Sequence, residues 1–279
     1  MEMDVVVNNF IEALVAKGET SEDVCTRLQS LGWHAESARR ALKRLEQGTA
    51  SISGTIVPGP DLDSLPSSLV VDGQAMQVEM RMHSPRLCLL GHVLTQQECD
   101  ELIEIARPRL SQSLVLLADI DGETDGVQSY SRTSKQANLA YGEHPLVDRI
   151  HQRIAKLTRW PASQMERLQV VRYGVGADFV PHHDFFCPKA HQELIASQGQ
   201  RLASVILYLN TPEYGGMTSF LDAELEIYPR TGSALYFSYP ETSVDSQTLH
   251  AGVPVVSGEK WIATFFLRDR VVDHTKEEN

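Results

Sequence analysis

The sequence predicts an α+β fold, in which a double-stranded β-helix (jelly roll) core is buttressed by helices and preceded by a small N-terminal all-helical module. Apolar residues recur at helical spacing in the first part of the chain and in two later stretches. From residue 168 onward, short strand-like runs follow one another, separated by Gly, Pro and Asn. Crossover helices are not expected between these runs, which argues against a parallel doubly wound sheet.

Residues 1–48 are expected to form a small helical bundle. Apolar residues at helical spacing precede Gly18, and Thr20 with the acidic residues after it suits the N-terminal cap of a second helix. A third helix is expected over residues 35–46. The three helices resemble a ubiquitin-associated-type bundle, which would bind a protein partner. The alternative is a helical extension that packs on the main domain.

Residues 49–75 are rich in Ser, Gly, Pro and Asp, a composition that cannot bury enough apolar surface to fold alone. They are therefore expected to be a flexible linker, followed by one main domain over residues 76–279. Within that domain, residues 111–131 are polar and rich in Gly, Asp and Ser, which predicts a mobile loop.

The main domain begins with strand-like alternation from Met76 to Leu90. The segment from Thr95 to Glu98 is typical of a capping box, and it precedes a predicted helix over residues 99–106. Another helix is expected from about His144 to Leu157. Strands are then expected over residues 168–173, 202–209, 224–228, 234–239 and 261–267.

Charge and composition narrow the class of protein. The formal net charge of −12 argues against a nucleic-acid partner, because phosphate binding needs clustered Lys and Arg. No run approaches the roughly 18 consecutive apolar residues of a spanning helix, so no membrane partner is expected. The four cysteines are scattered without a C-x-x-C pair, which indicates free thiols. Together with an acidic start, these features predict a cytoplasmic protein.

The segment Pro181-His182-His183-Asp184 carries the first chemical signal. In a strand, alternate side chains share a face, so His182 and Asp184 would point together and His183 away from them. Two imidazoles and one carboxylate form the facial triad of non-haem Fe(II) oxygenases, so a second, distant His is needed. His-x-Asp alone also arises by chance.

The segment Leu249-His250-Ala251-Gly252 supplies this second His, and Lys260 follows at the start of an apolar strand. A buried ammonium needs a partner, and the remote carboxylate of a dicarboxylic acid would be one. The alternative is a solvent-facing lysine at the turn after Gly258.

Further motifs extend the pattern on both sides of these residues. They are Tyr173-x-x-Gly176, Arg201-x-x-Ser204-x-x-x-Tyr208-Leu209-Asn210, Gly215-Gly216-x-Thr218-x-Phe220, Pro229-x-x-Gly232 and Gly258-x-Lys260-Trp261, with Ser131-Arg132-Thr133-Ser134 upstream. With these motifs, the stretch 168–267 resembles the catalytic core of prolyl 4-hydroxylases, a family of Fe(II)- and 2-oxoglutarate-dependent dioxygenases. The similarity extends upstream to about Arg86.

The resemblance implies a role for each matched residue. Three of them would be the Fe(II) ligands: His182, Asp184 and His250. Lys260 would pair with the far carboxylate of 2-oxoglutarate, with Tyr173 and Thr218 as hydrogen-bond partners nearby. The alternatives are that Tyr173 is a core aromatic residue and Thr218 an ordinary strand residue.

On the substrate side, the resemblance implies that Arg201, Glu166 and Arg132 lie at the groove that binds a peptide. For Glu166 and Arg132 the alternative is a surface ion pair. Three departures from the family pattern lie near that groove and leave the substrate open. Phe179 stands where the family often has Tyr, Phe266 where Trp is common, and Arg268 where some members have His.

The implied activity is hydroxylation of a protein or peptide, most readily at C4 of proline. Molecular oxygen and 2-oxoglutarate would be consumed, succinate and CO2 released, and ascorbate used as reductant. One alternative is the same chemistry on another side chain or a free amino acid. From a different class, the alternative is a non-catalytic, cupin-like metal-binding interaction module.

Overall fold

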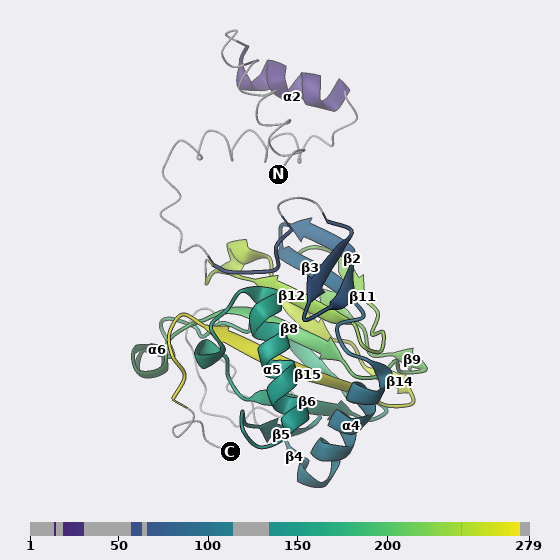
Figure 1. Cartoon of the computed structure of the whole chain (residues 1–279). Coiled ribbons are helices and arrows are strands. Elements are labelled where there is room, and N and C mark those ends of the chain that lie inside the picture. The colour runs from purple at the N-terminus through teal and green to yellow at the C-terminus, as the bar shows by residue number, and fades with distance from the viewer. Residues whose placement is uncertain are drawn as a thin grey trace. The chain divides into compact units, whose positions relative to one another are not determined.

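The structure is a computed structural model, and it describes residues 14, 19–30, 57–62, 66–113, 134–240 and 242–273. The chain divides into two compact units, drawn in Figure 1. The first comprises Met1–Thr55 and Leu62–Leu65, and the second Ile56–Asp61 and Pro66–Asn279. All the strands of the described part of the chain lie in the second unit.

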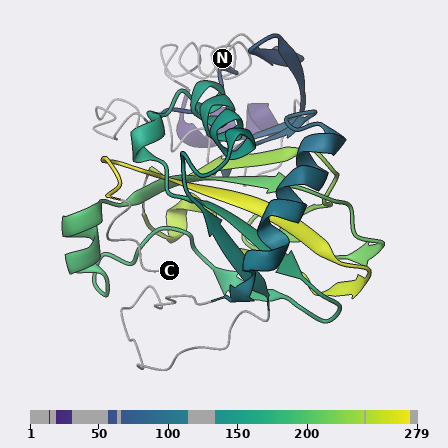
Figure 2. The same ribbon diagram turned by 60° about the horizontal axis from the view of Figure 1, so that its bottom comes forward.

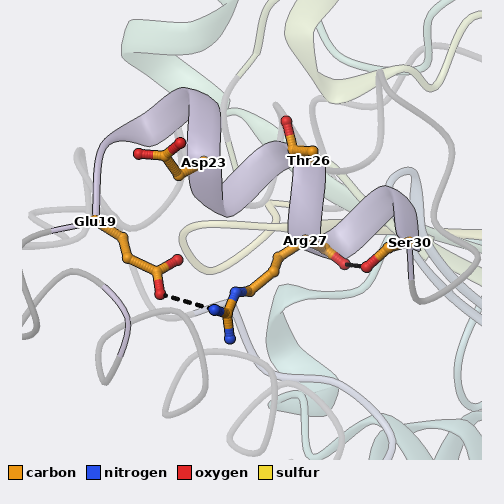
Figure 3. Close-up of a pocket in the computed structure, with 5 residues that line it drawn as sticks. All are labelled: Glu19, Asp23, Thr26, Arg27 and Ser30. Carbon is orange, nitrogen blue, oxygen red and sulfur yellow. Dashed lines mark hydrogen bonds and ion pairs between the residues drawn. The ribbon is translucent and has the colours of Figure 1, made fainter.

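In the first unit, helix α2 (Ser21–Ser30) begins at a cap formed by Thr20. The backbone N–H of Asp23 donates to Thr20 Oγ1 over 3.2 Å, and the backbone N–H of Thr20 donates to Asp23 Oδ2 over 3.1 Å. The predicted N-terminal cap is thereby confirmed. An open pocket runs along this helix (Figure 3), lined by Glu19, Asp23, Thr26, Arg27 and Ser30. The predicted third helix lies outside the described residues.

A nine-stranded antiparallel sheet forms the larger layer of the second unit (Figure 1). Its central strands are buried on both faces, and every residue of the strand from Arg201 to Tyr208 after the first is buried. In spatial order the strands are β1 (Ser68–Val71), β2 (Gln74–His83), β3 (Arg86–Gly91), β12 (Ala234–Ser238), β8 (Arg201–Tyr208), β15 (Lys260–Arg268), β6 (Leu168–Tyr173), β5 (Lys135–Leu139) and β4 (Ser111–Gln112).

A four-stranded sheet faces one side of this layer. Its strands in spatial order are β11 (Leu225–Ile227), β10 (Thr218–Phe220), β13 (His250–Gly252) and β7 (Phe179–His182). One core cluster joins Val171 and Ile206 of the large sheet to Phe220 and Ile227 of the small sheet. The two sheets therefore face each other across a shared apolar core. A separate two-stranded sheet pairs β14 (Val255–Ser257) with β9 (Tyr214–Gly215).

Two helices lie across the other face of the large sheet, as Figures 1 and 2 show. Helix α4 (Gln96–Ala106) begins at the predicted capping box, in which Thr95 and Glu98 each satisfy the other's backbone N–H. Helix α5 (Pro145–Thr158) packs its buried His151 edge-on against Phe265 of β15, with ring centres 4.6 Å apart. The shorter helical segments are η1 (Arg107–Arg109), η2 (Ala162–Gln164), α6 (Gln192–Gln198) and η3 (Val244–Ser246).

Alternation along β15 divides its side chains between the two layers. Phe265 faces the helices, as does Trp261, whose ring lies 5.1 Å from the guanidinium of Arg107. Ile262 belongs to the core between the sheets, and Lys260, two residues earlier, shares its face. The strand that forms the centre of the hydrophobic layer thus also places an ammonium group inside it.

The mixed architecture with large antiparallel sheets is confirmed, and the predicted strand over residues 168–173 coincides with β6. One boundary needs correction. Residues 68–71 form β1 and residue 74 begins β2, although the sequence places both in the linker. The two strands pair with each other, and this hairpin extends the large sheet. Residues 114–131 of the predicted mobile loop lie outside the described residues.

The four cysteines are free thiols, as predicted. Burial raises the pKa of the Cys88 and Cys99 thiols to about 12, so both are protonated at neutral pH. In the part of the chain that the structure describes, no helix is both long enough and apolar enough to span a bilayer.

Candidate active site

Three side chains that suit a metal ion meet on the small sheet. His182, at the end of β7, stands directly opposite His250, at the start of β13. Asp184 Oδ1 lies 3.4 Å from His182 Nε2 and 3.8 Å from His250 Nε2. One ligand atom from each residue lies within 4.8 Å of the others, and this is the one such group of His, Cys, Asp or Glu found among the described residues. The structure thus brings together the three residues expected from the sequence.

Asp184 reaches this group by a route that the sequence did not predict. Strand β7 ends at His182, and Asp184 occupies the bend that follows it. Its Oδ2 accepts a hydrogen bond of 2.6 Å from the hydroxyl of Ser204 on β8. His182 and Asp184 point to the same place, as expected, but Asp184 lies beyond the end of the strand, so alternation along one strand does not explain its direction.

Backbone carbonyls orient both imidazoles. His182 Nδ1 lies 2.9 Å from the carbonyl oxygen of Val180, and His250 Nδ1 lies 3.0 Å from that of Thr248. A carbonyl only accepts, so each Nδ1 is the donor and each Nε2 carries the lone pair. Both lone-pair nitrogens are the ones that lie near Asp184 Oδ1. The imidazoles therefore have the tautomer that a metal ligand needs, with Nδ1 held as is usual for metal-binding histidines.

The charges at this site also suit a cation. Burial alone would raise the pKa of Asp184, but in the acid range, where His250 is protonated, its imidazolium together with His182 and the Ser204 hydroxyl holds that pKa well below its usual range. Burial lowers the pKa of His250 to about 4. At neutral pH the site accordingly contains a carboxylate and a neutral His250, which are the protonation states that bind metal. Two imidazole nitrogens and one carboxylate oxygen match the donor set of non-haem Fe(II) oxygenases.

Lys260 lies on the inner face of the large sheet and is only 3% exposed, so the solvent-facing alternative is wrong. Its ammonium lies 5.4 Å from the centre of the Tyr173 ring and 6.0 Å from that of Tyr208. Tyr208 donates a hydrogen bond of 2.9 Å to Thr218 Oγ1. A side chain at Gly216, whose φ is +72°, would lie 3.3 Å from Lys260 Cδ, so glycine there gives the lysine room.

Tyr173 and Thr218, the two expected partners of the cosubstrate, thus gather around Lys260. Each is buried, with 4% and 3% of its surface exposed. Tyr173 ends β6 of the large sheet, and Thr218 begins β10 of the small sheet. The burial of Tyr173 fits a core aromatic residue as well as a role in binding, and the place of Thr218 in β10 fits an ordinary strand residue as well as a role in binding.

Beyond the metal group, Glu166 joins two arginines. Arg201 donates to it from Nε and Nη2 over 2.6 and 2.7 Å, and Arg268 donates from Nε over 2.7 Å. Burial alone would raise the pKa of Glu166, but the two guanidiniums hold that pKa below its usual range. The predicted ion pair of Glu166 exists, but it is buried rather than at the surface, with the Glu166 side chain 11% exposed. Arg132 lies outside the described residues.

Two aromatic rings contact the Arg201 side of this cluster. The Arg201 guanidinium lies 3.6 Å from the centre of the Phe266 ring and 4.7 Å from that of Phe186. Arg201 Nη1 also makes a long contact of 3.4 Å with the carbonyl oxygen of Asp184. Two of the departures from the family pattern, Phe266 and Arg268, are therefore neighbours of Arg201.

Sequence reasoning missed three residues that support the site: Ser204, Tyr239 and Gln200. Ser204 lies inside a motif that was recognised, but the motif gave no sign of the contact with Asp184. Tyr239 contacts the Ser204 hydroxyl, with the two oxygens 2.8 Å apart. The Gln200 side chain donates to the carbonyl and accepts from the N–H of Phe186, both over 2.8 Å. This pair of bonds fixes the segment that follows Asp184.

The comparisons with known proteins first define the class. Residues 168–268 match the model of the 2OG-Fe(II) oxygenase superfamily, and this range contains the three grouped side chains and Lys260. The donor set agrees with that chemistry. With the relatives described next, this match makes the protein a 2-oxoglutarate-dependent dioxygenase that uses Fe(II).

The relatives then define the family. The chain is 33% identical over 212 residues to probable prolyl 4-hydroxylase 10 of Arabidopsis thaliana, covering 68% of this chain and 71% of that protein. It is 35% identical to prolyl 4-hydroxylase subunit alpha-1 of Gallus gallus, covering 67% of this chain and 36% of that one. Among solved structures, a viral collagen prolyl hydroxylase from Paramecium Bursaria Chlorella virus-1, in its 2OG complex, gives a TM-score of 0.50. That match has 29% identity and covers 65% of this chain and 95% of the viral chain. The chain belongs to the prolyl 4-hydroxylase family.

Proposed function

We propose that this protein hydroxylates C4 of proline residues in a protein or peptide. One oxygen atom of O2 would enter the C–H bond, and the other would enter succinate as 2-oxoglutarate loses CO2. The observation that carries the proposal is the meeting of His182, Asp184 and His250, with their lone pairs converging, in a chain of the prolyl 4-hydroxylase family.

In this proposal His182 Nε2, Asp184 Oδ1 and His250 Nε2 hold Fe(II). When bound, the iron supplies the oxygen chemistry that these side chains cannot perform themselves. The protein's part is placement. The bonds from Nδ1 to the backbone keep both imidazoles turned to the metal, and the three ligands leave coordination positions for cosubstrate and oxygen.

Lys260 would hold the far carboxylate of 2-oxoglutarate by a charge-assisted hydrogen bond, with Tyr173 and Thr218 beside it. The site around Lys260 is buried, so the ion pair would be little screened by water. This contact would orient the cosubstrate toward the metal ligands. Ascorbate, the reductant expected from the family resemblance, would restore Fe(II) after turnover without substrate.

On the substrate side, Arg201 is the residue that we assign to the peptide, since its side chain keeps 20% of its surface exposed. Glu166 and Arg268 would hold Arg201 in place rather than touch the substrate. Arg132 is assigned to the same groove on the resemblance alone. Because Phe266 and Arg268 depart from the family pattern beside Arg201, the same chemistry on another side chain or a free amino acid is the second candidate function.

We also propose that the two facing sheets form a double-stranded β-helix catalytic domain that extends to residue 279. Residues 1–48 would form a separate helical module that recruits a protein partner, joined through a linker that begins near residue 49. The four free thiols favour the cytoplasm as the compartment.

The direct test is anaerobic reconstitution with Fe(II), followed by succinate release from 2-oxoglutarate on admission of air. The assay runs with and without proline-containing peptides. We expect peptide-stimulated succinate and a peptide mass increase of one oxygen atom. Lys260→Ala should raise the KM for 2-oxoglutarate roughly 30-fold or more, because removing one partner of a buried charge pair costs about 2 kcal/mol or more.

Lys156→Ala is the matched control, because Lys156 forms an exposed ion pair with Asp72 on a different part of the domain. It should leave the KM unchanged. Succinate release that responds to another side chain or a free amino acid, and not to prolyl peptides, would favour the second candidate. Absence of both iron binding and turnover would overturn the proposed hydroxylase function and favour a non-catalytic interaction module.

A further inference from the structure

We propose that Ser204 and Tyr239 are positioning residues that make Asp184 a ligand through one oxygen only. The inference rests on the proposed iron triad and goes beyond it, because neither residue touches the metal, the cosubstrate or the substrate in that proposal. In this inference, residues of the large sheet and its margin orient Asp184, which lies in the bend after β7.

The directions of the two hydrogen bonds follow from counting donors. Asp184 is a carboxylate and can only accept, so Ser204 Oγ must donate its single proton to Asp184 Oδ2 over 2.6 Å. The oxygens of Ser204 and Tyr239 lie 2.8 Å apart, and Ser204 has no proton left for that bond. Tyr239 must therefore donate to Ser204. The result is a directed chain from Tyr239 through Ser204 to Asp184, in which each bond polarises the next.

This series of hydrogen bonds gives the two oxygens of the Asp184 carboxylate different partners. Oδ1 faces the lone-pair nitrogens of His182 and His250, at 3.4 and 3.8 Å. Oδ2 points the other way, into the hydroxyl of Ser204. A carboxylate that can turn freely is able to bind a metal through both oxygens, and the second oxygen would then fill a position needed by 2-oxoglutarate or oxygen. Held as it is, Asp184 leaves that position open.

Strand pairing and burial support the two residues that form these hydrogen bonds. Ser204 lies in the middle of β8, where it pairs with Phe237 of β12 on one side and Phe266 of β15 on the other. Tyr239 follows β12, and its backbone N–H donates to the carbonyl of Leu202 over 2.9 Å. Both side chains have 0% of their surface exposed, so water is not at hand to replace a deleted hydroxyl.

The test is binding of Co(II), a coloured and air-stable substitute for Fe(II), to the full-length metal-free protein. We expect Ser204→Ala to weaken Co(II) binding roughly 10- to 100-fold, the usual cost of losing a group that orients a metal ligand. Tyr239→Phe should weaken it less, because Ser204 can still donate. In both variants we expect the visible spectrum of bound Co(II) to change, and the affinity of the Co(II) protein for 2-oxoglutarate to fall.

Two matched controls separate positioning from general loss of stability. Ser233→Ala removes another buried hydroxyl, which donates to the carbonyl of Arg230 over 2.6 Å. Tyr236→Phe removes another buried phenol hydroxyl, which donates to the carbonyl of Pro58 over 2.6 Å. Both should bind Co(II) with the affinity and spectrum of the unchanged protein.

The outcomes distinguish this inference from the proposed function. If the unchanged protein binds Co(II) and Asp184→Ala does not, the triad stands. Unaltered affinity and spectrum in Ser204→Ala and Tyr239→Phe would then overturn the positioning role alone, and so would an equal loss in the control variants. If Ser204→Ala fails to fold, Tyr239→Phe decides the question, since it keeps the ring and removes one atom. Failure of the unchanged protein to bind Co(II) would overturn both proposals.

Discussion

Two buried carboxylates lie near the candidate active site, and each is kept ionised in a different way. Asp184 meets two imidazoles and a hydroxyl, and its pKa is held well below its usual range. Glu166 meets two guanidiniums, and its pKa is also lowered. Taken as whole residues, both are less than one-tenth exposed. Burial alone would have raised both pKa values, so in each case the partners outweigh it.

The two carboxylates differ in whether their neighbours carry a positive charge at neutral pH. Arg201 and Arg268 carry permanent positive charge, so the cluster around Glu166 is complete without a further ion. His250, with its pKa lowered to about 4, is neutral at pH 7 and leaves the charge of Asp184 without a cation. Glu166 is therefore part of an ion cluster that needs no metal. Asp184, by contrast, lies with the two imidazoles as a potential metal ligand.

The largest expected effect comes from breaking the complete cluster. Glu166→Gln leaves two guanidiniums close together with no carboxylate, and we expect it to lower the free energy of unfolding by about 3 kcal/mol. The estimate takes the lower end of the range for buried pairs because Arg201 is 20% exposed. Urea unfolding measures the change. Glu104→Gln is the control, since Glu104 pairs with Arg107 at the surface, and it should cost less than about 1 kcal/mol. Equal losses of unfolding free energy in Glu166→Gln and Glu104→Gln would contradict the claim that the buried cluster matters more than a surface ion pair.

Asp184→Asn should act on metal binding instead. In the unchanged protein, a divalent metal at 100 times its dissociation constant should stabilise the fold by about 2.7 kcal/mol, and this gain should vanish in the variant. Thermal unfolding with and without Co(II) measures it. Asp222→Asn, at an exposed carboxylate in the turn after β10, is the control and should keep the full metal-dependent rise. A metal-dependent rise that persists in Asp184→Asn would remove Asp184 from the ligand set.

The pH dependence of stability should separate Glu166 from its glutamine variant. The pKa of Glu166 is lowered in the folded protein, so its contribution is fully present above its ordinary value of 4.5 and is lost as the pH falls below that value. Glutamine does not titrate. The stability difference between the unchanged protein and Glu166→Gln should therefore be constant from pH 7 to about 5 and should narrow at lower pH. Urea unfolding at several pH values tests this, and a gap that widens on acidification would contradict it.

The sequence predicted the elements well where a local pattern is decisive. The bounds of β6 follow from a six-residue stretch in which four residues are apolar, and the start of α4 follows from the capping box at Thr95. The three potential metal ligands and Lys260 followed from motifs, because their spacing reflects the chemistry of the site itself. Their meeting in the structure is consistent with those motifs.

Contacts between distant strands were beyond such reasoning. Glu166 meets Arg201 across 35 positions and Arg268 across 102, and nothing local marks charged residues of this kind as buried. Asp184 was expected on a strand because alternation explained its direction, but Ser204 supplies that direction from another sheet. A sequence pattern reports which face a residue occupies, whereas the partner on the opposite face depends on how the sheets are joined.

The smallest expected effect concerns the ring under Arg201. Phe266→Leu keeps an apolar side chain and removes the aromatic face that lies 3.6 Å from the guanidinium. We expect a loss of about 0.5 to 1 kcal/mol in the free energy of unfolding, the range for a cation–π contact at a partly exposed site. A double-mutant cycle with Arg201→Met isolates the contact, since each variant alone also changes packing. The metal-dependent stabilisation should stay intact in Phe266→Leu, because the contact of Phe266 is with Arg201 of the ion cluster around Glu166. A coupling energy near zero would mean that the ring only fills space, and loss of metal binding would mean that the two carboxylate regions are not independent.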